Sequence, residues 1–190
     1  MSVALAAPSA ASVDRLREAT GLAQLGLIVG TALLTGLLAQ FEIRLYLWEV
    51  PLTLQSLAVY SSGLFLGWRT GALAMLLYLA LGLVLPFYAG GAAGIGHLLG
   101  ASAGYLIGFP LVALVVGSVT RRQRGLGRSA LALLAGSVVL FSCGVIGLQV
   151  VTDLTWAESV VNGRLRFIPW DLTKLALVGA VYAVARRVTS

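Results

Sequence analysis

Six long apolar runs dominate this sequence, and they constrain what it can fold into. They lie at about 22–41, 52–67, 71–88, 98–119, 129–151 and 169–185. A helix needs about 20 apolar residues to cross roughly 30 Å of hydrocarbon. Only 11% of the residues are charged, against about a quarter in soluble domains. We therefore expect an all-α, polytopic membrane protein with six transmembrane helices. Residues 21–190 would form one membrane domain, after a tail of residues 1–20 that ends in a short surface helix.

The second and last runs are short, and each begins at a proline, Pro51 or Pro169. We expect irregular backbone at these helix ends. Such backbone is tolerated at membrane depth only where it is buried in protein or lines a cavity.

The distribution of positive charges predicts the orientation in the membrane. Short cytoplasmic loops carry the excess of Lys and Arg, and six spans place both termini on one side. Four positive residues lie on the other side: Arg44, Arg164, Arg166 and Lys174. The side of the termini carries Arg15, Arg17, Arg69, Arg121, Arg122, Arg124, Arg128, Arg186 and Arg187. We predict cytoplasmic termini in the cell membrane, with outer loops at about 42–51, 89–97 and 152–168. The net charge of +6 then reflects contact with membrane lipid and needs no nucleic acid to explain it.

An acid and the only lysine of the chain, Asp171 and Lys174, stand three residues apart at the start of the last run. Pro169 suits the first position of a helix, so both side chains fall on one face near its beginning. An ionised side chain at membrane depth costs about 2.5–3.5 kcal/mol on insertion scales, so such a pair normally faces a polar cavity or a ligand. The alternative is an ion pair that satisfies itself at the interface. The neighbouring Trp170 is either an interface anchor or the wall of a pocket.

Residue types needed for several other chemistries are missing. The chain has one cysteine, Cys143, and one histidine, His97, which excludes disulfides within the chain and gives no metal-ligand spacing. Lys174 follows Thr173 and precedes Leu175, so no P-loop is present. We expect no cofactor and no metal, and any ATP hydrolysis belongs to other subunits.

The segment Gly100-Ala101-Ser102-Ala103-Gly104 matches the G-x-S-x-G pattern of serine hydrolases. His97 precedes Ser102 by five residues on the same segment, whereas a membrane serine protease needs a histidine from another helix. The pattern also requires a strand before the serine, which a membrane helix cannot supply. An intramembrane serine hydrolase therefore remains a minor alternative.

Small residues recur at helical spacing in the first apolar run. Gly26, Gly30, Ala32 and Gly36 form small-xxx-small patterns, which let helix backbones approach closely in lipid. A partner helix could dock there, and packing within the bundle explains the pattern about as well.

Two parts of the chain carry a family resemblance. The first contains Pro51-Leu52-Thr53-Leu54-Gln55, Gly63, Gly67, Gly71, Leu77-Tyr78, Gly82, Pro86-Phe87, Gly90-Gly91, Gly100 and Gly104-Tyr105-Leu106-Ile107-Gly108-Phe109. The second, residues 167–174, is similar to a segment F-x-P-G-D-x-x-K. Together they resemble the BioY family. Trp170 departs from the usual glycine, and Ala101-Ser102-Ala103 stands where Pro-Thr-Gly is common.

The resemblance implies a function. BioY proteins are six-helix, biotin-binding S components of energy-coupling-factor (ECF) transporters. The chain would capture biotin at the outer face and deliver it with a transmembrane coupling subunit and a pair of ATPases. Residues of the first helix such as Ala32 and Gly36 would form the docking surface. An S component for another vitamin and a secondary transporter are alternatives, and a homo-oligomer is left open.

Biotin presents a ureido ring, an apolar thioether ring and a carboxylate. Asp171 can accept a hydrogen bond from a ureido N–H, and Lys174 can donate to the ureido carbonyl or fix the aspartate. The remaining predicted site residues are Gln55, Thr53 and Tyr105 for the polar edges, and Tyr88, Trp170, Gly90 and Gly91 around the apolar ring. For the carboxylate, the candidates are Arg44, Arg164, Arg166 and solvent.

Overall fold

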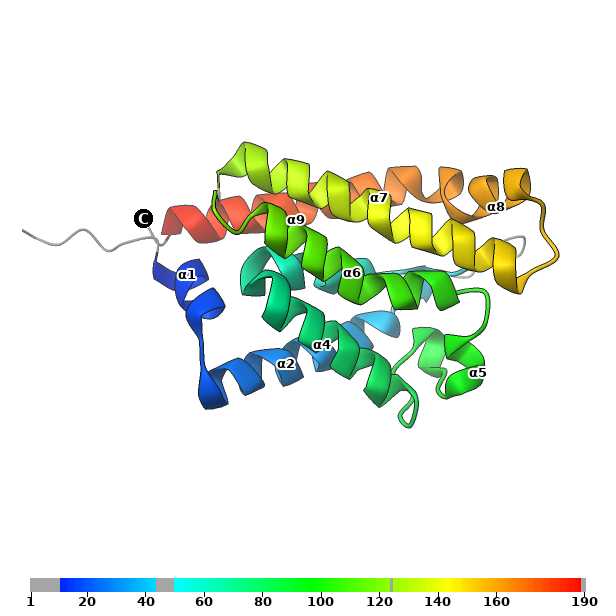
Figure 1. Ribbon diagram of the computed structural model, residues 1–190, viewed down its shortest axis with the longest axis horizontal. Coiled ribbons are helices and arrows are strands. Elements are labelled where there is room, and N and C mark those ends of the chain that lie inside the picture. The colour runs from blue at the N-terminus through cyan, green and yellow to red at the C-terminus, as the bar shows by residue number, and fades with distance from the viewer. Residues whose placement is uncertain (1–10, 44–49, 124, 189–190) are drawn as a thin grey trace, which may run out of the picture.

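The helices of this protein run along one long axis and pack side by side (Figure 1). The structure, a computed structural model, describes residues 11–43, 50–123 and 125–188. The apolar segments are α2 (Gly21–Ala39), α3 (Gln55–Ser61) with the π-helix η1 (Ser62–Leu66), α4 (Gly67–Gly82), α6 (Ala103–Val119), α7 (Leu126–Val151) and α9 (Ile168–Val188). The shorter elements are α1 (Ala11–Glu18), β1 (Glu42–Ile43), β2 (Leu52–Thr53), the 3-10 turn η2 (Ala89–Gly91), α5 (Ile95–Leu98), α8 (Trp156–Gly163) and the 3-10 turn η3 (Leu165–Phe167).

Within the described residues, four helical stretches are long and apolar enough to cross a membrane: Gly21–Ala39, Gln55–Gly82, Leu126–Val151 and Trp156–Arg187. The stretch Ala103–Val119 is a shorter apolar helix.

The stretch Gln55–Gly82 is two spans, because the chain reverses direction inside it. Gly67 has a φ of 80°, which favours glycine because other L-residues rarely adopt it. A Cβ on Gly71 would lie 2.8 Å from the carbonyl carbon of Ser62. Nine residues of straight helix would separate these positions by about 13 Å. Counting α3–η1 and α4 separately, the described segments match the six predicted runs and confirm the predicted architecture.

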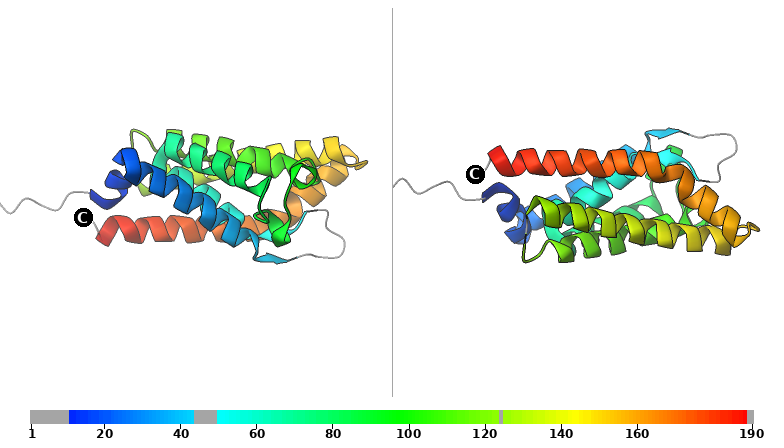
Figure 2. Two further views of the ribbon diagram at one scale, coloured as in Figure 1. Left: turned by 90° about the horizontal axis from the view of Figure 1, so that it is seen from below. Right: turned by 90° about the horizontal axis from the view of Figure 1, so that it is seen from above.

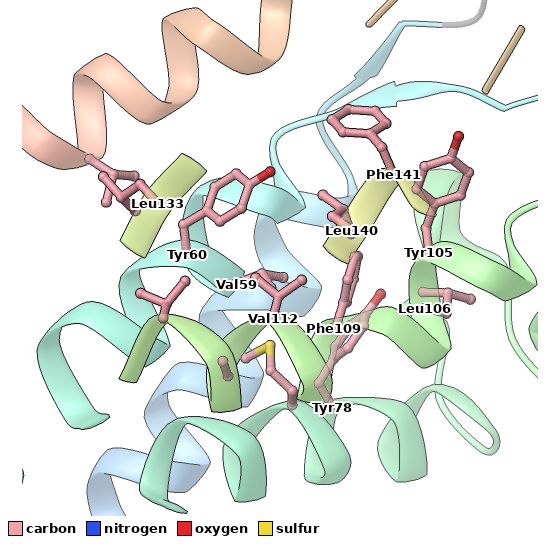
Figure 3. Packing of buried hydrophobic residues seen from close by; sticks show 14 of the residues in the cluster. Val59, Tyr60, Tyr78, Tyr105, Leu106, Phe109, Val112, Leu133, Leu140 and Phe141 are labelled. Atoms are coloured by element: carbon pink, nitrogen blue, oxygen red, sulfur yellow. The ribbon is translucent and has the colours of Figure 1, made fainter. Parts of the chain in front are cut away.

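Helices α6 and α7 approach so closely that their contact requires glycine. A Cβ added to Gly104 would lie 2.1 Å from the carbonyl oxygen of Cys143, and one added to Gly147 would lie 2.4 Å from the Cα of Gly104. In lipid no hydrophobic effect drives helices together, so the close van der Waals packing that small residues allow stabilises such crossings. Figure 3 shows large buried side chains of the core, among them Tyr60, Phe109 and Phe141.

The small residues of α2 divide into two groups. Ala32 is fully buried, and a Cβ on Gly36 would lie 2.8 Å from the ring of Phe87. Gly26 and Gly30 are exposed, and a Cβ added to either of them would meet no atom within 4 Å. Ala32 and Gly36 therefore pack inside the bundle, the alternative to docking that the sequence left open, and a docking role for them stays a prediction. Among the four predicted docking residues, only Gly26 and Gly30 are exposed and accessible to a partner helix.

The helix in the N-terminal tail is α1, and a half-buried arginine attaches it to the bundle. Arg17 donates hydrogen bonds to the carbonyl oxygen of Thr120 at 3.0 Å, to the hydroxyl of Thr120 at 2.9 Å, and to the carbonyl oxygen of Leu64. Figure 2 shows α1 and the C-terminal end of α9 together at one end of the bundle.

The connections at the opposite end contain short elements. β1 pairs antiparallel with β2, with Glu42 opposite Thr53, a small departure from an all-α fold. Elements η2 and α5 connect α4 to α6, and elements α8 and η3 connect α7 to α9. These segments surround the cavity described next.

Candidate functional site

A cavity lies in the bundle, at the end opposite α1. It is lined by Val50, Pro51, Thr53, Gln55, Ser56, Ala89, His97, Ser102, Tyr105, Leu106, Phe109, Leu140, Phe141, Phe167 and Lys174. Four of the predicted site residues are brought together here: Thr53, Gln55, Tyr105 and Lys174.

Lys174 is the charged group of the cavity wall. Its Nζ donates to the backbone carbonyl of Thr53 at 2.7 Å and to the hydroxyl of Ser56 at 3.0 Å. The short strand β2, which precedes α3, supplies the Thr53 carbonyl. An ammonium has three N–H donors, so one donor is left to point toward a ligand.

Gln55 provides a neutral polar group at the start of α3. Its side-chain N–H donates to the hydroxyl of Tyr78 at 3.0 Å, and the residue is buried. This bond orients the amide and leaves its carbonyl oxygen as an acceptor, because an amide side chain carries both functions.

Aromatic rings line another part of the cavity. The Tyr105 hydroxyl donates to the backbone carbonyl of Gly163, so its polar end is already used. The rings of Tyr105 and Phe141 meet edge to face with centroids 6.1 Å apart, and Phe167 lies 6.1 Å from Phe141. Figure 3 shows Tyr105 and Phe141 beside each other, with Leu140, Leu106 and Phe109 nearby. The cavity lining therefore contains both polar and apolar groups.

Asp171 is not among the residues that line the cavity. It is buried, with 5% of its surface exposed. The hydroxyl of Tyr60 donates to Oδ1 at 2.7 Å, and the hydroxyl of Ser137 donates to Oδ2 at 2.5 Å. Among the described residues no salt bridge joins Asp171 to Lys174, so the two charges do not form a self-satisfied ion pair.

Comparison with known proteins identifies the family. The model of the BioY family matches residues 9–190. This chain belongs to the BioY family. A protein of Rhodobacter capsulatus named biotin transporter BioY is 37% identical over 147 residues, covering 70% of this chain and 76% of that protein. A protein of the same name from Rhizobium etli is 37% identical over 142 residues, covering 70% and 75%.

A solved structure has the same fold. It is described as the S component for biotin from an ECF-type ABC transporter, and it matches with a TM-score of 0.76 and 26% identity. The match covers 87% of this chain and 89% of that one. The chain is thus a membrane protein of a transporter family.

The other predicted site residues lie around the BioY cavity and not in its wall. Tyr88 stacks on His97 with centroids 5.1 Å apart, and its hydroxyl donates to the carbonyl of Leu79 at 2.8 Å. Burial raises the pKa of the Tyr88 phenol, which keeps this donor protonated. Gly90 and Gly91 adopt φ values of 64° and 74° in the turn after Tyr88.

Trp170 is half exposed and borders a neighbouring groove with Phe41 and Ile43, which shares Thr53 and Lys174 with the cavity. Arg44 lies outside the described residues. Arg164 and Arg166 precede α9 in the connection from α8.

Sequence reasoning missed much of the BioY cavity. The sequence pattern connects Ser102 and His97 only with hydrolysis, although both line the cavity. Phe109 and Phe167 belong to the segments that carry the resemblance, whereas Ser56 and Phe141 have no distinguishing signal. Their positions depend on which face of each helix the bundle buries.

Proposed function

We propose that this protein is a biotin-binding S component that captures biotin in the cavity at the outer face of the cytoplasmic membrane. The observation that carries the proposal is the mixed lining of the cavity, which combines the polar residues Lys174 and Gln55 with the aromatic residues Tyr105 and Phe141. It occurs in a chain whose relatives are named biotin transporters.

The polar and apolar parts of biotin are complementary to the polar and aromatic residues of the cavity lining. The free N–H of Lys174 donates to the ureido carbonyl, and the oxygen of Gln55 accepts from a ureido N–H. Tyr105, Phe141 and Phe167 cover the apolar thioether ring. A small number of oriented polar groups in an apolar pocket is the usual basis of small-molecule specificity.

Asp171 supports the site without lining the cavity. It stands three residues before Lys174 on α9, and its carboxylate provides the negative charge that favours the charged form of a buried amine. Its bonds to Tyr60 and Ser137 fix the part of α9 from which Lys174 projects. A direct contact with biotin would require the carboxylate to exchange one of these two hydroxyl partners.

Release into the cytoplasm requires other subunits. We propose an ECF transmembrane coupling subunit and ATPases as partners, because no nucleotide-binding motif is present in the sequence. Both termini are cytoplasmic in this proposal, since α1 and the end of α9 share the end of the bundle that carries most of the arginines.

Copurification after mild solubilisation tests the proposed function and partners. The expected result is biotin bound to the protein, together with a coupling subunit and ATPases. A competition assay then tests the choice of vitamin: biotin is expected to displace labelled biotin, whereas riboflavin and thiamine are not. Displacement by another vitamin in preference to biotin would contradict the proposal and favour a related S component.

A further inference from the structure

Arg164 does not line the cavity, but its backbone is held next to residues that do. The preceding residue, Gly163, accepts a hydrogen bond from the hydroxyl of Tyr105, which lines the cavity. The backbone carbonyl of Arg164 accepts from the N–H of Phe167 at 2.9 Å. The chain at Arg164 is therefore attached on both sides to aromatic residues of the cavity wall.

The Arg164 side chain is directed toward the same wall. Its guanidinium carbon lies 5.5 Å from the ring centroid of Phe141, within the range of a cation–π contact. The residue is half-buried. These relationships place a permanent positive charge beside the apolar side of the site.

The donors of Arg164 are available. No hydrogen bond or salt bridge reaches its guanidinium from the part of the chain that the structure describes. The acid on α8, Glu158, is engaged with Thr155 in a capping box. Lys174, in contrast, already uses two of its donors within the protein. A guanidinium offers five N–H donors in a planar fork that matches a carboxylate.

We propose that Arg164 binds the carboxylate of the ligand and makes the site selective for an anionic form of it. The inference rests on the proposed function, because biotin carries one carboxylate at the end of an aliphatic chain. The chain would lie along Phe141, which leads from the cavity to the guanidinium. Arg166, two residues further on, takes part in another interaction. Arg164 is therefore the better placed of the two described outer arginines.

The test compares biotin with its neutral carboxamide, biotinamide, in calorimetric titrations of the purified protein and its Arg164→Gln variant. The wild type is expected to bind biotin at least about tenfold more tightly than the amide, since a charge-assisted pair is worth roughly a factor of ten or more. Arg164→Gln should weaken biotin by about the same factor and leave the amide within about twofold. Arg166→Gln is the matched control and should change neither affinity.

Arg164→Lys keeps the positive charge but lacks the planar set of guanidinium donors. It is the alternative variant if Arg164→Gln does not fold. It should weaken biotin a few-fold and leave the amide unchanged. Equal weakening of both ligands by the Arg164 variants, or no weakening of biotin, would overturn the inference and leave Arg164 as a structural partner of Phe141. If the wild type binds neither ligand, the proposed function itself fails, which is a different result.

Discussion

The hydroxyl of Tyr60 donates a hydrogen bond of 2.7 Å to the carboxylate of Asp171, although the two residues lie 111 positions apart in the chain. Ser137 donates to the other oxygen of the same carboxylate. One buried acid thus connects α3, α7 and α9. Because a buried charge without donors is very costly, both hydroxyl groups should stabilise the packing of these three helices.

Removing the Tyr60 hydroxyl should therefore destabilise the protein. We expect Tyr60→Phe to lower the free energy of unfolding by about 1 kcal/mol or more, because Asp171 loses one of its two donors. Tyr182→Phe is the matched control, since the Tyr182 hydroxyl is buried without a partner among the described residues. Denaturant unfolding of both variants in detergent measures the difference. Equal stability of the two variants would show that the bond to Asp171 contributes nothing.

The Lys174 ammonium should be essential for binding. Lys174→Met keeps most of the side-chain length but removes the donors to Thr53 and Ser56 and the donor available to a ligand. We expect the affinity for biotin to fall by at least about tenfold. Trp170→Phe, outside the cavity lining, should leave the affinity unchanged. A calorimetric titration in which Trp170→Phe has the larger effect would place the site in the neighbouring groove.

The contact between α6 and α7 should tolerate no added methyl group. Gly104→Ala would place a Cβ 2.1 Å from the Cys143 carbonyl oxygen, so we expect a loss of about 3 kcal/mol or more, at the upper end of overpacking effects. Gly26→Ala meets no atom within 4 Å and should be neutral or stabilising, because alanine is the better helix former. Thermal stability followed by size-exclusion chromatography distinguishes the variants. A stable Gly104→Ala protein would contradict the observed helix separation.

Arg17 should hold α1 against the bundle. Arg17→Gln cannot make the three bonds to Thr120 and Leu64, so we expect faster hydrogen exchange in Ala11–Glu18 with little change in the membrane helices. The exposed neighbour Arg15 provides the control, because Arg15→Gln removes the same charge from the same helix. Similar exchange in both variants would mean that α1 is held by other contacts.

Much of the fold could be predicted from hydrophobicity alone, because lipid requires each span to be a continuous apolar helix. Helix boundaries were less predictable. The run 71–88 ends as a helix at Gly82, and the run 98–119 begins as α6 at Ala103. The reversal at Gly67 has no loop between its two helices, and its only sequence signal is one glycine among 23.

Part of the cavity lining could be predicted, because a charged residue in an apolar run draws attention to it. A single lysine in an apolar run identified Lys174, and the segment before α3 identified Thr53 and Gln55. The partners of Asp171 were not predictable, because Tyr60 and Ser137 are ordinary neutral residues of distant helices. Their role follows from helix rotation, which the sequence pattern does not specify.

Equilibrium titration of the purified, folded protein with biotin tests the central claim most directly. We predict saturable binding of one biotin per chain, weakened by Lys174→Met and unaffected by Trp170→Phe. A folded wild-type protein that shows no saturable binding of biotin would contradict the account.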